Sequence, residues 1–193
     1  RTDVRDADAM ERALDEARRE HGRVHGGVVN AGVWPPDDVP LIDLDPERVE
    51  AVLGVNLAGA FWTARAFLRA LRASGPDPAG HGASLVFPGS PAAPFGARGH
   101  SDYAASKSGL YGLMRSLKNE VVALDPYARV NVVEPGWTVT EMTAKNLDAP
   151  GTVERVVRTM PVQQLARTAD IANTIVWLLS PRAARHLTGE VLT

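Results

Sequence analysis

The sequence predicts an α/β protein with a doubly wound parallel sheet, on two observations. Short apolar runs typical of buried strands alternate with single stretches of helical periodicity. Asn30, Ser90 and Pro135 each stand close behind one of these apolar runs. Because ligands bind outside the carboxyl ends of the strands in such a sheet, we expect these positions to border a ligand site.

The composition suits a single globular domain over residues 1–193. The chain is 45% hydrophobic and 23% charged. Its net charge of −2 gives no electrostatic attraction for nucleic acid or an anionic membrane, and apolar runs such as 175–179 are too short to span a bilayer. The absence of cysteine excludes disulfides and thiolate metal sites. We expect a cytoplasmic protein without nucleic-acid or membrane partners.

The first elements are a strand end, a helix and a strand. Residues 1–4 resemble the tail of a strand, and 6–20 form an amphipathic helix with acidic residues in its first turn. The run at 26–30 is predicted to be a buried strand. It ends in Asn30-Ala31-Gly32, small residues that let a backbone approach a ligand closely, although an ordinary turn explains this tripeptide equally well.

A long helix follows the Pro- and Asp-rich loop at 34–44. Asp45 is its expected cap, Pro46 lies in its first turn, and it runs to about Ala73. Asn56 stands in its middle, where asparagine is a poor helix former. Asn56 therefore either bonds to neighbouring backbone or has a functional task.

Strands and helices keep alternating in the second half, joined at first by a Gly/Pro linker at 74–83. The predicted elements are strands at 84–87, 128–134 and 190–192, a loop at 137–149, a short helix at 152–158, and a helix at 171–179 capped by Thr168-Ala169-Asp170.

Tyr103 and Lys107 lie one turn apart on a predicted helix that Ser101 or Asp102 caps. At this spacing their Cβ atoms are about 5–6 Å apart. A neighbouring ammonium is expected to lower the phenol pKa by about 1–3 units, which would let Tyr103 exchange a proton near neutral pH. The usual explanation of such a pair is a half-buried aromatic and a solvated charge. The chain has only three tyrosines and three lysines against eighteen arginines, which favours the chemical explanation here.

Taken together, the motifs resemble the single-domain short-chain dehydrogenase/reductase family and its Asn-Ser-Tyr-Lys tetrad. Asn56, Ser90, Tyr103 and Lys107 match the tetrad in order and spacing. The supporting motifs are Asp3-Val4, Asn30-Ala31-Gly32, Pro135-Gly136-Trp137-Thr138-Val139-Thr140 and Thr188-Gly189-Glu190-Val191-Leu192. The resemblance implies a Rossmann-like fold, of which this chain would form the C-terminal two-thirds, and NAD(P)-dependent interconversion of a carbonyl and a secondary alcohol.

The resemblance also implies a role for each matching residue. Ser90 would hold the substrate oxygen while Tyr103 transfers its proton, Lys107 would bond the nicotinamide ribose, and Asn56 would hold a water in the relay. The implied cofactor contacts are Asp3 and Val4 at the adenine, Asn30, Ala31 and Gly32 near the adenosine ribose, and Pro135, Gly136, Thr138 and Thr140 at the nicotinamide. Residues 141–160 would form a substrate lid.

The family's first Gly-rich unit has no counterpart in the sequence, so we expect an N-terminally incomplete domain. The segment that distinguishes NAD from NADP belongs to that unit, and the cofactor is therefore NAD or NADP. Val28 and Val29 would then lie on an unpaired apolar edge.

Several alternatives remain open. Thr140-Glu141-Met142-Thr143 and the tail 160–193 resemble the 3-oxoacyl-carrier-protein reductase branch. A non-catalytic binding or assembly module is the second hypothesis. A sugar epimerase or dehydratase is the third, and Pro135-Gly136 and the Thr188-Gly189 ending disfavour it. The five histidines show no metal spacing and are expected on the surface or in loops, with His100 a candidate for the substrate pocket. The resemblance further implies a homodimer or homotetramer.

Overall fold

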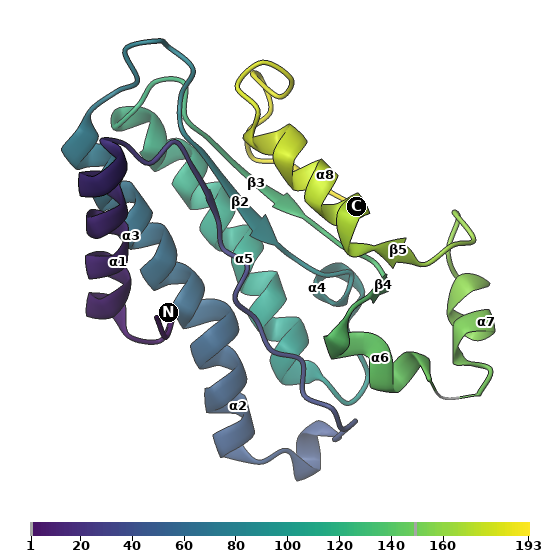
Figure 1. Cartoon of the computed structure of the whole chain (residues 1–193). Helices are drawn as coiled ribbons and strands as arrows, with labels where there is room; N and C mark the ends of the chain where they lie inside the picture. The colour runs from purple at the N-terminus through teal and green to yellow at the C-terminus, as the bar shows by residue number, and fades with distance from the viewer. Residues whose placement is uncertain (1, 149) are drawn as a thin grey trace.

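The computed structural model describes residues 2–148 and 150–193, and it has the predicted α/β architecture (Figure 1). Four parallel strands form the sheet in the order β1 (Gly26–Val28), β2 (Ser84–Pro88), β3 (Arg129–Val133) and β6 (Val191–Leu192). A separate parallel pair is formed by β4 (Thr138–Val139) and β5 (Ala166–Arg167).

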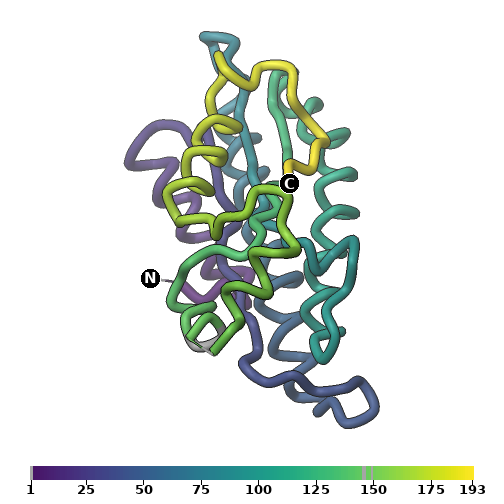
Figure 2. Tube along the Cα trace, turned by 90° about the vertical axis from the view of Figure 1, so that its right-hand side faces the viewer, coloured from purple at the N-terminus to yellow at the C-terminus, as the bar shows by residue number. Residues whose placement is uncertain are grey.

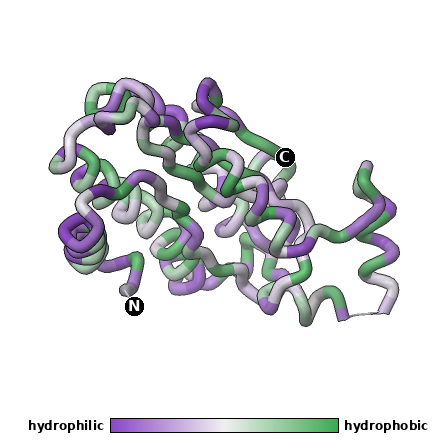
Figure 3. The backbone as a smooth tube through the Cα atoms, turned by 45° about the horizontal axis from the view of Figure 1, so that its top comes forward, coloured by the Kyte–Doolittle hydropathy of each residue, from purple (hydrophilic) through white to green (hydrophobic). Residues whose placement is uncertain are grey.

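Helices cover both faces of the sheet. One core cluster holds Phe67 of α3 (Gly59–Ser74) and Met114 of α5 (Ser101–Glu120) against Leu85 of β2. On the other face, Leu178 of α8 (Thr168–Leu179) packs on Val86. Leu85 and Val86 point to opposite faces because side chains alternate along a strand. Hydrophilic and hydrophobic residues accordingly alternate along the helices, as expected of amphipathic helices (Figure 3).

The long predicted helix is continuous but not uniform. It consists of α2 (Pro46–Leu53), a π-helical turn at Gly54–Ala58 and α3. By length and composition its 29 residues are apolar enough to cross a membrane, yet Ala60, Ala64 and Phe67 on its inner side belong to the core. π-Turns inside α-helices occur frequently at functional sites, and this one carries Asn56.

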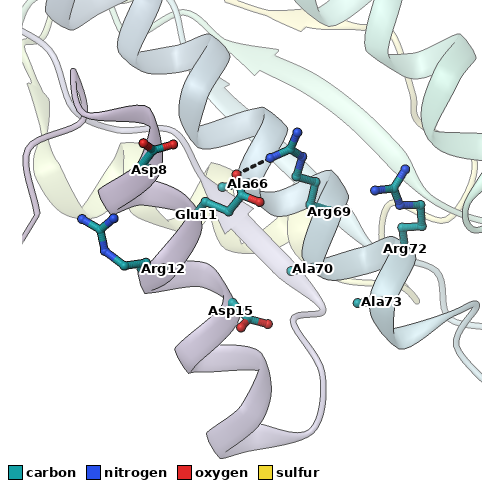
Figure 4. A pocket seen from close by; sticks show the side chains of 9 residues that line it. All are labelled: Asp8, Glu11, Arg12, Asp15, Ala66, Arg69, Ala70, Arg72 and Ala73. Carbon is teal, nitrogen blue, oxygen red and sulfur yellow. Dashed lines mark hydrogen bonds and ion pairs between the residues drawn. The ribbon is translucent and has the colours of Figure 1, made fainter.

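Helix α1 (Ala7–His21) lies against the outer side of α3 (Figure 4). Ala66 and Ala70 let the two helices approach closely, and Glu11 pairs across the groove with Arg65 and Arg69. Because these charges are solvent-exposed, the small residues rather than the ion pairs are the main determinant of this packing.

Some local expectations are wrong. Residues 2–4 are not a strand: Asp6 N–H donates to the carbonyl of Asp3 in a turn, and no neighbouring strand pairs with it in the described chain. Neither Ser101 nor Asp102 caps α5, since the carboxylate of Asp102 is drawn to Arg48. Val29 is buried and donates to Val86, so only Val28, 38% exposed, lies open at the sheet edge.

The predicted loops also contain short elements that local propensity did not indicate. They are a 3-10 turn at Leu41–Asp43, α4 (Ala92–Phe95), a 3-10 turn at Val121–Ala123, β4, α6 (Glu141–Leu147) and β5. The predicted short helix at 152–158 is confirmed as α7 (Thr152–Val157). Figures 1 and 2 show α6 and α7 standing beyond the carboxyl ends of the strands, away from the sheet.

The linker before β2 yields a stability prediction. Gly82 has φ +71°, and a Cβ there would lie 2.1 Å from the carbonyl oxygen of Tyr127. Gly80, in the same linker with φ +67°, would meet only a ring carbon of Tyr127 at 3.8 Å. Gly80→Ala should cost about 1–2 kcal/mol, the penalty of the left-handed backbone alone. Gly82→Ala adds a backbone clash and should lose more than about 3 kcal/mol.

Urea unfolding of the two variants measures the difference, with equal m-values required for the comparison. Equal losses would mean that the close approach of the linker to Tyr127 contributes nothing to stability.

Candidate active site

A cavity of about 1080 Å³ opens at the carboxyl ends of the strands, where the sequence predicts a ligand site. Its lining combines residues from the ends of β1, β2 and β3 with the first turns of α5. The predicted site residues that line it are Asn30, Ala31, Gly32, Ser90, Tyr103, Lys107, Pro135, Gly136, Thr138 and Thr140. Asp3, Val4 and Asn56 do not line it.

Tyr103 and Ser90 meet at the floor of this cavity. Tyr103 is 9% exposed, and burial raises its pKa, while a hydrogen bond with the Ser90 side chain acts in the opposite direction. The Ser90 hydroxyl also accepts the backbone N–H of Ala92 at 3.2 Å, which orients it at the start of α4. The phenol is therefore held in its protonated form, next to a hydroxyl that can share a substrate oxygen.

Lys107 occupies the next turn of the same helix face. Its Nζ donates to the carbonyl of Pro88 at 2.9 Å and lies 5.7 Å from the centroid of the Tyr103 ring. Burial lowers the pKa of Lys107 to about 8. The Tyr103 pKa is raised and not lowered as expected, because desolvation outweighs the hydrogen bond with Ser90 at the phenol.

Asn56 links the π-turn to the loop after β1 and to α5. Its Oδ1 accepts Val33 N–H at 2.7 Å, and its Nδ2 donates to the Val33 carbonyl at 3.0 Å and to the Ser106 hydroxyl at 3.1 Å. Ser106 in turn donates to the carbonyl of Tyr103 at 2.7 Å. Both donors of Asn56 are thus used by protein groups, and its water-holding role stays a prediction.

Asp3 and Val4 lie beside the long helix and do not line the cavity. The Asp3 carboxylate pairs with Arg5 at 2.7 Å, and the hydrogen bonds from Arg5 hold its pKa at about 2. Val4 packs against Gly59, where a Cβ would stand 2.7 Å from Val4 Cγ2. The adenine contacts expected of both residues stay a prediction.

Gly32, which follows β1, helps to show whether a nicotinamide nucleotide would fit the cavity. A Cβ on Gly32 would lie 3.5 Å from Asn56 Oδ1 and 3.6 Å from Lys107 Nζ, so it would fill the space in front of both groups. That bare backbone, the Lys107 ammonium and a cavity of this volume fit a nucleotide sugar and its ring.

Sequence reasoning missed several residues of the site. Trp34, Phe95, Ile171 and Ile175 line the cavity, beside Trp137 and Met142 of the predicted motif and lid. His100 does not line it and is not a surface residue: it is 1% exposed and stacks behind Trp34. The other four histidines are exposed, as expected. A bulky aromatic directly after Asn-Ala-Gly-Val was the available signal for Trp34.

The segment predicted to be a lid contributes to the cavity wall. Thr140 and Thr143 form a capping box that begins α6, and Met142, Thr143 and Thr159 face the cavity. The predicted range includes residue 149, which lies outside the described residues. Within the described residues no group of three or more His, Asp or Glu side chains could hold a metal ion.

Comparisons with known proteins agree on the class of protein. The family model described as enoyl-(acyl carrier protein) reductase matches residues 1–193. The chain is 32% identical over 191 residues to acetoacetyl-CoA reductase of Synechocystis sp., covering 98% of this chain and 74% of that protein. It is also 32% identical over 194 residues to the 3-oxoacyl-[acyl-carrier-protein] reductase MabA of Mycobacterium tuberculosis, with 98% and 72% covered.

Solved structures agree as well. A short-chain alcohol dehydrogenase from Sinorhizobium meliloti superposes with a TM-score of 0.86 at 30% identity, covering 99% of this chain and 71% of the other. A short-chain dehydrogenase/reductase from Brucella melitensis gives 0.85 at 28% identity with the same coverage. The predicted fold class and family are confirmed: the chain belongs to the short-chain dehydrogenase/reductase family, the NAD- or NADP-dependent oxidoreductases of carbonyl and alcohol groups.

Proposed function

We propose that this chain works chiefly as a ketone reductase, with Tyr103 as the acid that protonates the substrate oxygen. The observation that carries the proposal is the pair of hydroxyls at the cavity, where the buried Tyr103 phenol is hydrogen-bonded to the Ser90 side chain and is protonated at neutral pH, as an ordinary phenol is. A protonated acid serves reduction, whereas alcohol oxidation needs its conjugate base. The bound nicotinamide supplies the hydride.

Ser90 and Lys107 complete the acid–base group in this proposal. A substrate oxygen placed between the hydroxyls of Ser90 and Tyr103 would accept two hydrogen bonds, which stabilise the negative charge that develops on it. Lys107 lies within reach of the cavity and is anchored to Pro88, so its ammonium is positioned to bind a ribose hydroxyl. Asn56 would act as a positioning residue, because its side chain holds Val33 and Ser106 by hydrogen bonds.

The second candidate names the substrate as a 3-oxoacyl thioester. Relatives described as acetoacetyl-CoA reductase and as 3-oxoacyl-[acyl-carrier-protein] reductase support it. A relative described as L-rhamnose 1-dehydrogenase, 31% identical, represents the competing sugar substrates. The lid role of residues 141–160 belongs to the same proposal.

A homodimer or homotetramer also stays part of the proposal. Val176 and Trp177 on α8 are 65% and 40% exposed, and Phe61 on α3 is 45% exposed. Exposed apolar side chains on two helices are consistent with contacts between copies. The cytoplasmic location and the lack of nucleic-acid and membrane partners remain expectations from composition.

Replacing Tyr103 with Phe tests the acid role. The variant keeps the ring and its packing but loses the proton, so kcat for reduction should fall by about 10²–10⁴-fold. Absorbance of the reduced cofactor follows turnover in the whole protein. Cofactor binding, measured by energy transfer from tryptophan, should stay within about twofold of wild type. Unchanged kcat with the cofactor bound would remove Tyr103 from the chemistry.

The lowered pKa of Lys107 predicts a pH dependence of stability. Between pH 8 and the model-peptide value of 10.5, the unfolded chain keeps a proton that the folded chain has released, so the free energy of unfolding rises with pH. Relative to Lys107→Met, which cannot titrate, wild type should gain on the order of 3 kcal/mol across this range. Urea unfolding between pH 7.5 and pH 9.5 covers the lower part of this range and should record about 2 kcal/mol of the gain. A difference that does not change with pH would mean that Lys107 titrates normally.

A further inference from the structure

The cavity contains little that recognises charge. Among the described residues that line it, Lys107 is the only one with an ionised side chain, and it is anchored to Pro88. Much of the wall is apolar, formed by Trp34, Phe95, Trp137, Met142, Ile171 and Ile175. Lys107 is the one counter-charge that a carboxylate would find among these residues, and on the Trp34 side of Tyr103 a polyhydroxylated chain would meet an indole ring and not hydrogen-bond partners.

Trp34 is the aromatic ring next to the acid. Its ring centroid lies 4.6 Å from that of Tyr103, with the planes at 78°, an edge-to-face contact. Trp34 also stacks on His100, with the two ring centroids 3.8 Å apart and the planes at 16°. Its Nε1 is buried without a hydrogen-bond partner in the described part of the chain, so the ring is held by packing alone.

His100 is itself fixed. It is 1% exposed, its Nε2 lies 3.0 Å from the carbonyl of Pro35, and its Nδ1 lies 3.3 Å from the carbonyl of Arg98. The ring therefore connects the loop after β1 to the loop before α5. Trp34 cannot swing away from Tyr103 without displacing His100.

Arg48 ties the same two loops together. Its guanidinium donates to the carbonyl of Asp37 at 2.8 Å, to that of Gly99 at 3.1 Å and to the carboxylate of Asp102 at 2.9 Å. The Asp102 side chain is fully buried, and Asp102 directly precedes Tyr103. The loop bearing Trp34 and the helix turn bearing Tyr103 thus share one buried ion pair.

We propose that Trp34 is a specificity-determining residue that selects ketones with a flat apolar substituent over charged or polyhydroxylated ones. The indole forms a wall beside the Tyr103 ring, and the substituent packs on the part of the indole that borders the cavity. Such aromatic contacts favour a phenyl group by about 0.5–1.5 kcal/mol beyond its burial. The inference rests on the proposed ketone reduction at Tyr103.

The test compares methyl ketones that differ in one substituent, using the whole protein and its cofactor. Benzylacetone and butanone differ by a phenyl ring, while acetoacetate carries a charge and dihydroxyacetone carries hydroxyls. Wild type should reduce benzylacetone with a kcat/KM at least about tenfold above that for each of the other three. A preference for acetoacetate or dihydroxyacetone would overturn the proposal.

Trp34→Ala should lower the benzylacetone-to-butanone ratio of kcat/KM by about tenfold, and Trp34→Phe should keep most of it. Both rates come from the same sample, so the ratio does not depend on the fraction of folded enzyme. Trp177→Ala, which removes an indole outside the cavity, is the matched control and should leave the ratio unchanged.

The two proposals fail in different ways. A wild type that reduces benzylacetone but keeps its ratio in Trp34→Ala refutes the role of Trp34 and leaves the ketone reductase intact. A wild type that oxidises alcohols but reduces none of the four ketones refutes the proposed function and, with it, the inference.

Discussion

The burial of polar side chains on the first two turns of α5 is the constraint on which the site depends. Asp102, Tyr103, Ser106 and Lys107 are all at most 9% exposed, although each carries a polar group. Removing such groups from water costs free energy unless each finds a partner. The partners are Arg48, Ser90, Asn56 and Pro88, which come from different segments of the chain. These contacts therefore fix the start of α5 relative to the strand ends.

The same burial determines the chemistry, and it acts oppositely on the two titrating groups. Desolvation favours the neutral form of each, so it raises the pKa of Tyr103 and lowers that of Lys107 to about 8. Lys107 is hydrogen-bonded to the Pro88 carbonyl and lies 5.7 Å from the centroid of the Tyr103 ring, but desolvation is the larger influence on the phenol. A neutral phenol can donate a proton to a substrate oxygen, which is the step that the proposed reduction requires.

Much of the site could be predicted from the sequence because its residues follow strands or lie one helical turn apart. Asn30, Ser90 and Pro135 were placed by the strand ends, and Tyr103 with Lys107 by helical spacing. What failed depended on contacts between distant residues. Aspartate often caps helices, but the Asp102 carboxylate instead forms a buried ion pair with Arg48, 54 residues away. The direction of the Tyr103 pKa shift depends on how deeply the phenol is buried, which sequence spacing cannot tell. The strand expected at residues 2–4 did not form because no neighbouring strand pairs with it in the described chain.

The π-turn at Asn56 shows how the fold uses a local irregularity. Asparagine in a regular helix faces its neighbours' backbone, but here its amide reaches Val33 and Ser106 on two other segments. Val33 is followed by Trp34, and Ser106 is bonded to the carbonyl of Tyr103. Arg48, two turns earlier on the same long helix, reaches the same loop and the same turn of α5. One helix thus holds the loop bearing Trp34 and the part of α5 bearing Tyr103 relative to each other, through Arg48 and Asn56. The proposed selectivity and the proposed proton transfer therefore depend on the same framework.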